Sequence, residues 1–297
     1  MQIRLLIIQF LSISILIAGQ DDISPWFYSL LPGGSHFYNG DYKDAILFST
    51  AELTLAAAGL LINDEINQNN NEINVPLLLS QQIYIIDKWA YYQKIQLRDK
   101  KKYPSNATPI QFDATPLSKL ISSPFRKEII LTQFVLGFSL LGIVDGIVSY
   151  PAHNKSYKHI SSVTTVQTKL DRTQGSLIYE SMVFSVSGGA ATSEELFFRG
   201  MLLPMLDYKF GQRTGLLSSS LIFGSLHLLN PGIDKPFYFF TQAFLAGVVF
   251  GRHVQQNNYE LSEVIAAHFW YNVISATTTW IINPKENPLG FGIQFNF

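Results

Sequence analysis

The feature that most constrains this chain is a set of long runs that contain no charged residue. Two of them lie in the last third of the chain, at residues 214–233 and 264–284. Each is as long as a helix that crosses the bilayer hydrocarbon, which takes roughly 20 mostly apolar residues. Shorter uncharged runs occupy residues 236–251 and 129–144. The pattern predicts an all-α fold, a multi-pass bundle of transmembrane helices.

Composition supports this class and excludes others. Charged residues make up 14% of the 297-residue chain, against about a quarter in an average soluble domain. The net charge of -1 leaves no basic excess to neutralise phosphates, so we expect no nucleic acid as a partner. The chain contains no cysteine, which excludes disulfides, thiolate metal sites and a cysteine nucleophile. We expect membrane lipid as a partner, and chemistry based on histidine and carboxylate side chains.

The chain divides into four expected regions. The first resembles a signal peptide or an uncleaved signal anchor, because Arg4 precedes an apolar run. The second is expected to hold one membrane helix at about 44–62 and a polar, partly helical soluble insert, with an amphipathic helix near 77–97. The third is the membrane helical core, and the fourth is a C-terminal tail. In order, these regions are residues 1–19, 20–127, 128–284 and 285–297.

A stretch rich in glycine and aromatic residues precedes the first of these membrane helices. Residues 31–42 read Leu-Pro-Gly-Gly-Ser-His-Phe-Tyr-Asn-Gly-Asp-Tyr. Glycine and proline favour turns, and aromatic side chains favour the membrane interface. We therefore interpret His36 as a turn or interface residue without a catalytic role.

The first of three ionisable clusters in the apolar segments is Glu194-Glu195-Leu-Phe-Phe-Arg199. Charge inside a membrane segment is costly and therefore indicates function. On a helix, Glu195 and Arg199 share a face and can pair, whereas Glu194 points about 100° away from Glu195. A carboxylate held in an apolar site binds its proton more tightly, which suits a general base near neutral pH. The alternative is a helix end at the membrane surface with all three charges hydrated.

The other two clusters contain histidine. His227 ends the sequence Phe-Gly-Ser-Leu-His in the middle of an uncharged run, and it is either reactive or bonded to a backbone carbonyl. His268 and Asn272 lie four residues apart in another run, so a helix places them on one face. That arrangement suits a polar pair directed into a bundle, either for chemistry or as a hydrogen-bonded pair that joins helices.

Other polar residues in the apolar segments are expected to lie outside an active site. We interpret Asp145 and Glu180 as helix-end or lumen-facing residues. Ser225 precedes His227 by two residues, about 200° around a helix, so the two cannot pair locally. No G-x-S-x-G elbow is present, which disfavours an intramembrane serine hydrolase.

The three clusters in this order resemble the CPBP family of intramembrane proteases, which includes the CAAX-type endoproteases and the bacterial Abi proteins. The motifs Glu-Glu-x-x-x-Arg, Phe-x-x-x-His and His-x-x-x-Asn carry the resemblance, which covers about residues 176–283. It implies a helical membrane bundle whose catalytic groups meet in a cavity, and cleavage of a membrane-associated peptide or protein substrate. With the signal-like start, it favours a multi-pass protein of the bacterial inner (cytoplasmic) membrane.

The resemblance also implies roles for the motif residues. Glu194 and His227 would activate the attacking water, while His268 and Asn272 would stabilise the oxyanion, as preorganised donors do in other hydrolases. Glu195 and Arg199 would hold the helix and the site together. The expected site therefore comprises Glu194, Glu195, Arg199, His227, His268 and Asn272.

Two questions stay open at this point. The family's usual description as metalloproteases implies zinc. Two histidines and a glutamate are enough for a zinc site with one open position, but the same groups can hydrolyse a peptide without metal, and no H-E-x-x-H is present. The other question is whether the chain is an enzyme at all. A non-catalytic membrane scaffold or bacteriocin-immunity-type protein would use the same fold.

Overall fold

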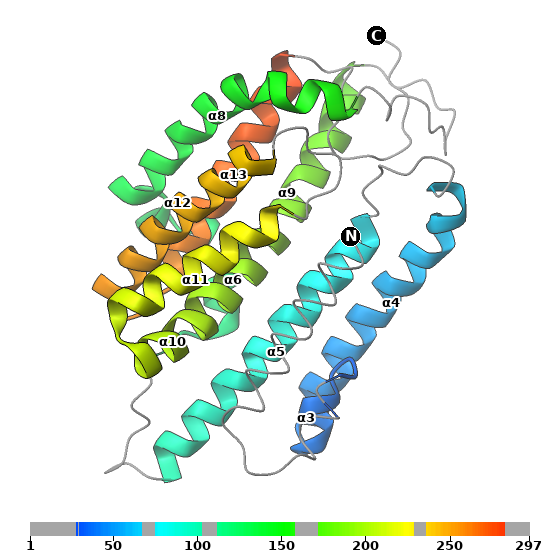
Figure 1. Cartoon of the computed structure of the whole chain (residues 1–297). Helices are drawn as coiled ribbons and strands as arrows, with labels where there is room; N and C mark the ends of the chain where they lie inside the picture. The colour runs from blue at the N-terminus through cyan, green and yellow to red at the C-terminus, as the bar shows by residue number, and fades with distance from the viewer. Residues whose placement is uncertain are drawn as a thin grey trace.

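The computed structural model describes residues 28, 30–66, 75–102, 112–157, 172–228 and 236–282. Over these ranges the chain forms helices and no strand, which confirms the all-α expectation (Figure 1). The signal-like segment 1–19 and the tail 285–297 were also subjects of prediction, and both lie outside the described residues.

The helices fall into an N-terminal and a C-terminal group. The N-terminal helices are α3 (Gly34–Tyr38), α4 (Tyr42–Ile66) and α5 (Val75–Lys102). Short segments follow, namely α6 (Leu117–Ser122), η2 (Ser123–Phe125) and α7 (Lys127–Ile130). The rest are α8 (Gln133–Tyr157), α9 (Arg172–Phe197), the π-helical segment η4 (Phe198–Leu202), α10 (Leu203–Phe210), α11 (Gln212–His227), α12 (Pro236–Gln256) and α13 (Ser262–Ile282).

Each long uncharged run of the sequence forms one of these helices. The runs 214–233, 236–251, 264–284 and 129–144 correspond to α11, α12, α13 and α8. None of the helices within the described ranges combines enough length with enough apolarity to cross a bilayer. Absence of charge is not the same as apolarity, since α11 contains Ser218, Ser219 and Ser220 and α13 contains Thr277, Thr278 and Thr279.

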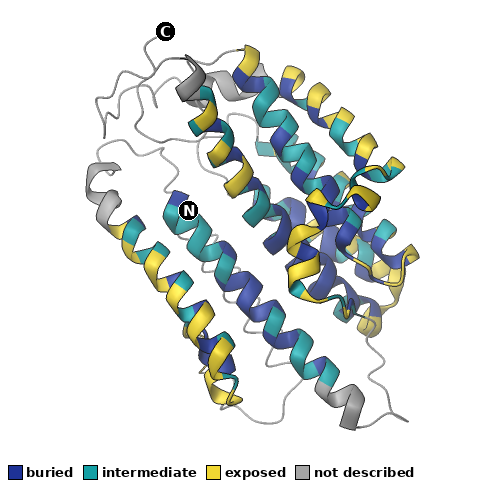
Figure 2. Ribbon diagram, turned by 180° about the vertical axis from the view of Figure 1, so that it is seen from behind, coloured by how far each residue is buried: buried dark blue, intermediate teal, exposed yellow. Residues whose placement is uncertain are grey.

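The helix expected in a soluble insert is instead part of the common core. It is longer than predicted, as α5, and it packs between α4 and α9 (Figure 1). Ile85, Ile86, Trp89 and Tyr92 lie on one face of α5 and are buried in the same cluster as residues of α9 and α13. Figure 2 shows α5 largely buried, whereas the outer side of α4 is exposed. The sequence indicated a soluble insert because this region is rich in polar residues, but in the structure those residues lie on the same helix as a continuous apolar face.

The close packing of α8 against α13 depends on two glycines one turn apart. A Cβ atom at Gly142 would lie 2.8 Å from the carbonyl oxygen of Tyr271, and one at Gly146 would lie 2.7 Å from that of Ser275. Both distances are too short for real contacts, so only glycine lets the two backbones approach this closely. This Gly-x-x-x-Gly spacing is the pattern by which small residues let helices pack tightly. It brings Asp145, which lies between the glycines, against α13.

Candidate active site

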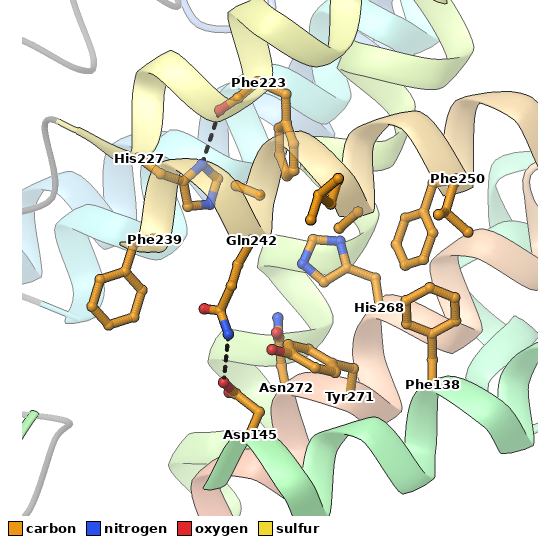
Figure 3. A pocket seen from close by; sticks show the side chains of 14 residues that line it. Phe138, Asp145, Phe223, His227, Phe239, Gln242, Phe250, His268, Tyr271 and Asn272 are labelled. Carbon is orange, nitrogen blue, oxygen red and sulfur yellow. Dashed lines mark hydrogen bonds between the residues drawn. The ribbon is translucent and has the colours of Figure 1, made fainter. Parts of the chain in front are cut away.

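Three of the six expected site residues line one cavity. The cavity has a volume of about 430 Å³ and lies among α8, α11, α12 and α13 (Figure 3). His227 reaches it from the end of α11, while His268 and Asn272 reach it from one face of α13. The structure therefore brings together two motifs that are separated by 40 residues of chain.

A buried carboxylate holds His268. Oε1 of Glu195 lies 2.7 Å from Nδ1 of His268 and 3.1 Å from Nη1 of Arg199. Glu195 is fully buried, and the guanidinium of Arg199 lies over the ring of Phe223, 4.3 Å from its centroid. The expected pairing of Glu195 with Arg199 is confirmed. Because a carboxylate only accepts hydrogen bonds, Nδ1 of His268 carries the proton, and Nε2 is left for a group in the cavity.

His227 has a defined tautomer. Its Nδ1 lies 2.9 Å from the carbonyl oxygen of Phe223, one turn earlier in α11 (Figure 3). A carbonyl oxygen can only accept, so Nδ1 is the donor, and in the neutral ring Nε2 is unprotonated. Both sequence interpretations of His227 are therefore met at once. The ring bonds a backbone carbonyl, and it also presents a basic nitrogen at a cavity wall.

The two glutamates differ in what they contact. Glu194 is half-buried in α9 and is not among the residues that line the cavity. Its charge acts on Arg199, which lies five residues later in η4. Glu195, which the sequence assigned to holding the helix, is the carboxylate that touches a site histidine. The difference arises because the contact with His268 crosses from one helix to another, which helical spacing alone cannot reveal.

Asp145 was expected outside the site, and this prediction is wrong. It lines the cavity from α8, and its two oxygens accept hydrogen bonds from Gln242 Nε2 at 3.0 Å and Ser275 Oγ at 2.7 Å (Figure 3). One carboxylate therefore joins α8, α12 and α13. The glycines on either side of Asp145 were the sequence signal that could have placed it. Glu180, by contrast, bonds Thr277 Oγ1 at 2.9 Å and does not line the cavity.

The remainder of the cavity wall is apolar. Its large apolar side chains come mainly from α12, with others from α8 and α11. They are Phe138, Phe223, Phe239, Leu245, Val249 and Phe250. The polar groups of the lining, which are the imidazoles, Asn272, Asp145, Gln242 and Tyr271, are therefore accompanied by a large apolar surface. A peptide bond placed there would have a low-dielectric environment on its other side, where hydrogen bonds from the protein are stronger.

The described residues do not form the zinc site that the sequence left open. A catalytic zinc ion takes three protein ligands and keeps one open position. Among the residues that the structure describes, no three histidine, aspartate or glutamate side chains converge on one point where an ion could bind. Nδ1 of His227 and Nδ1 of His268 each bond an oxygen of the protein, so Nε2 is the nitrogen of each ring that remains for another partner.

A π-helical segment begins within the first motif. Residues 198–202 form η4, which continues α9 and contains Arg199. π-Helical turns are rare and often occur at functional sites. Here a Cβ atom at Gly200 would lie 2.7 Å from Nε1 of Trp89 and 2.8 Å from Cδ1 of Leu261. The core helix α5 therefore packs directly against the turn that positions Arg199.

Two histidines and an asparagine therefore line one cavity, and a buried Glu–Arg pair holds one of these histidines. Residues 177–274 match the family model described as Type II CAAX prenyl endopeptidase Rce1-like. The match confirms the resemblance indicated by the three motifs, all of which lie inside it. No curated protein and no solved structure matches the chain. The helix α8, with Asp145, precedes the matched segment.

Proposed function

We propose that this protein is an endopeptidase that hydrolyses a peptide bond of a membrane-associated peptide or protein. The observation that carries the proposal is the shared cavity of His227, His268 and Asn272, with apolar walls on its other sides. The family match at residues 177–274 supports the same reaction class.

The attacking nucleophile is a water molecule activated at His227. The bond from Nδ1 to Phe223 leaves Nε2 to take a proton as the water oxygen attacks the carbonyl carbon. The motif assigns Glu194 to the same task, and support for that part comes from the sequence pattern. When the C–N bond breaks, the proton on Nε2 passes to the leaving amine. His227 therefore acts first as a base and then as an acid.

His268 and Asn272 stabilise the oxyanion. Nδ1 of His268 donates to Glu195, which fixes the orientation of the ring, and Nε2–H of the doubly protonated ring donates to the oxyanion. The side-chain amide of Asn272, one turn later on α13, supplies a second donor on the same wall. Donors fixed in advance in an apolar cavity are the usual source of the largest single catalytic effect in hydrolases.

We also propose that the protein works as an integral protein of the bacterial inner membrane. The support is the large apolar side chains that are exposed along the outer faces of α4 and α8 (Figure 2). They include Ile46, Leu47, Leu60, Leu140, Leu141, Val144, Ile147 and Val148. Contiguous apolar surface of this kind marks a face that contacts lipid or another protein.

The test is cleavage of a peptide library by the purified full chain in detergent micelles. Wild type is compared with His227→Ala, with Glu194→Ala, and with the control Glu128→Gln, whose side chain is exposed beyond the bundle. We expect cleavage by wild type and the control, and loss of cleavage in the two site variants with circular dichroism unchanged. Absence of cleavage in all four folded proteins would overturn the proposal and favour a non-catalytic scaffold.

A further inference from the structure

A second group of buried ionisable side chains lies far from the site, where α3, α4 and α5 pack together. His36, Asp87 and Lys88 have no measurable exposure, and Glu52 is 3% exposed. The sequence placed His36 at a turn or interface, but it is buried within α3 and stacks on Phe48. Four ionisable groups in one apolar interior are costly unless each finds a partner.

Asp87 and Lys88 largely satisfy each other. Oδ2 of Asp87 accepts hydrogen bonds from Nζ of Lys88 at 2.5 Å and from the backbone N–H of Gly33 at 3.3 Å. Its other oxygen lies 3.0 Å from Nε2 of His36. The ammonium also donates to the carbonyl oxygen of Leu31 at 3.3 Å. The one buried ammonium of this group is therefore committed to Asp87.

Glu52 does not share in the ion pair that Asp87 forms with Lys88. The charged groups that act on it are Asp87, which has the same sign, and Lys88, which is already paired. Its Oε1 is buried and has no hydrogen-bond partner in the protein. Buried polar atoms in native proteins are nearly always hydrogen-bonded, so an orphaned carboxylate oxygen calls for a partner from outside the chain.

Glu52 also lines a cavity that can hold such a partner. The cavity has a volume of about 260 Å³ and shares no residue with the one that contains His227 and His268. Its polar side chains are Glu52 on α4 and Ser80, Gln81 and Tyr84 on α5. Its apolar wall consists of Leu30, Pro32, Leu53, Ala56 and Leu77.

From this juxtaposition we propose that the cavity between α4 and α5 binds a small organic cation with a protonated primary amine. The ammonium donates a hydrogen bond to Oε1 of Glu52, and its charge balances the carboxylate. A short alkyl body packs against Leu53, Ala56 and Leu77. A divalent metal ion fits less well, because among the described residues no group of three suitable side chains is present. The same amine chemistry is found in free alkylamines and in the aminophospholipid headgroup.

The test is a calorimetric titration of the full chain in detergent with n-butylammonium, and with n-butanol as the uncharged match. We expect saturable binding of butylammonium and at least tenfold weaker binding of butanol. Glu52→Gln should weaken butylammonium binding about tenfold or more, since the charge-assisted bond is lost. Ala56→Leu should abolish binding by filling the cavity while the carboxylate stays. Glu128→Gln, an exposed change elsewhere, should leave it unchanged.

A competition experiment then distinguishes the two sources of the amine. Displacement of butylammonium by phosphatidylethanolamine, but not by phosphatidylglycerol, identifies the lipid headgroup, whereas no displacement by either identifies a free amine. The proposal is overturned if folded wild type shows no saturable binding, if butanol binds as well, or if both variants bind like wild type. If Glu52→Gln does not fold, Ala56→Leu decides. Binding here does not depend on the proposed peptidase activity.

Discussion

Glu195 and His268 are 73 residues apart in the chain and are joined by a 2.7 Å contact between Oε1 and Nδ1. The same oxygen accepts from Arg199, so one atom links the start of the π-helical segment to the middle of α13. The orientation of a proposed oxyanion donor therefore depends on a carboxylate outside the cavity wall.

The first prediction concerns this carboxylate. Glu195→Gln keeps the size of the side chain but replaces the charged acceptor that orients the ring of His268 with a neutral one. We expect kcat to fall roughly 100-fold, the usual loss when an oxyanion donor fails, with KM little changed. Because the change leaves the buried charge of Arg199 uncompensated, we also expect a stability loss of about 3 kcal/mol. Peptide cleavage and thermal unfolding measure the two effects.

A matched control is available on α13, the helix that carries His268. Glu263 also accepts from a histidine, with 2.8 Å between its Oε2 and Nε2 of His253, but both side chains are partly exposed and neither lines the cavity. Glu263→Gln should change stability by less than about 1 kcal/mol and leave kcat unchanged. Equal effects of the two substitutions would contradict the assigned role of Glu195.

The second prediction concerns the tautomer of His227. His227→Gln can still donate a hydrogen bond toward Phe223 but lacks a basic nitrogen, so we expect kcat to fall by about 10²- to 10⁴-fold without loss of helix. His253→Gln serves as the control, because His253 lies outside the cavity lining. Retention of cleavage in His227→Gln would exclude this residue as the base.

The third prediction concerns Asp145. Asp145→Ala removes an acceptor from Gln242 and from Ser275, both of them partly buried, and the loss of these two hydrogen bonds should cost about 0.5–1.5 kcal/mol each. It should also lower kcat, since Asn272 lies on the helix that Asp145 holds. Asp145→Asn keeps an acceptor oxygen and should recover much of both losses. Unfolding midpoints and kcat are the measurements.

Glu180→Ala is the control for this third prediction. Glu180 also bonds a hydroxyl of α13, that of Thr277, but away from the cavity. The substitution should therefore lower stability without lowering kcat. If Asp145→Ala behaves in the same way, Asp145 is a structural residue only.

The fourth prediction compares two glycines of α8. In Gly146→Ala the new Cβ would meet Cβ of Thr278 at 2.6 Å and the Ser275 carbonyl oxygen at 2.7 Å, which pushes α8 from α13. We expect a loss of about 1–3 kcal/mol. A Cβ at Gly137 meets nothing within 4 Å, so Gly137→Ala should gain about 0.5–1 kcal/mol from the higher helix propensity of alanine. Thermal unfolding should show changes of opposite sign for the two substitutions, and a Gly146→Ala protein as stable as wild type would contradict the close approach.

The fifth prediction is a pH dependence at the junction of α10 with the α12–α13 turn. Burial raises the pKa of Asp207 above its ordinary value, although Tyr259 and Gln255 donate hydrogen bonds to it. A raised pKa in the folded state means that the stabilising contribution is present below the ordinary pKa and is lost as pH rises through the raised one. Asp207→Asn lacks this titration. Its stability relative to wild type should therefore increase as pH rises through that window, and a constant difference in unfolding free energy would refute the effect.

The sequence predicted what local spacing determines. The uncharged runs correspond to helices, and the four-residue interval between His268 and Asn272 placed both side chains on the face that lines the cavity. The interval between Glu195 and Arg199 likewise predicted their pair.

Contacts between helices were beyond the reach of local spacing. Whether Glu194 or Glu195 meets a site histidine depends on how α9 is rotated against α13, and this rotation is set by packing against many side chains. The burial of α5 was not predicted because the interpretation relied on the number of its charged residues and not on its apolar face, which includes Trp89. The orphaned oxygen of Glu52 could not be foreseen either, since it depends on Lys88 bonding Asp87 instead.

The position of α8 has a consequence for where a working fragment of this chain can begin. The match to the family model starts at residue 177. Phe138 and Asp145, which line one side of the cavity, precede it. Gly142 and Gly146, against which α13 packs closely, also precede it. A polypeptide cut at the first matched residue would retain every motif and lose the wall opposite them. A fragment that keeps the whole cavity must therefore reach back to the start of α8, so that its boundary follows the architecture of the cavity rather than the extent of the recognisable motifs.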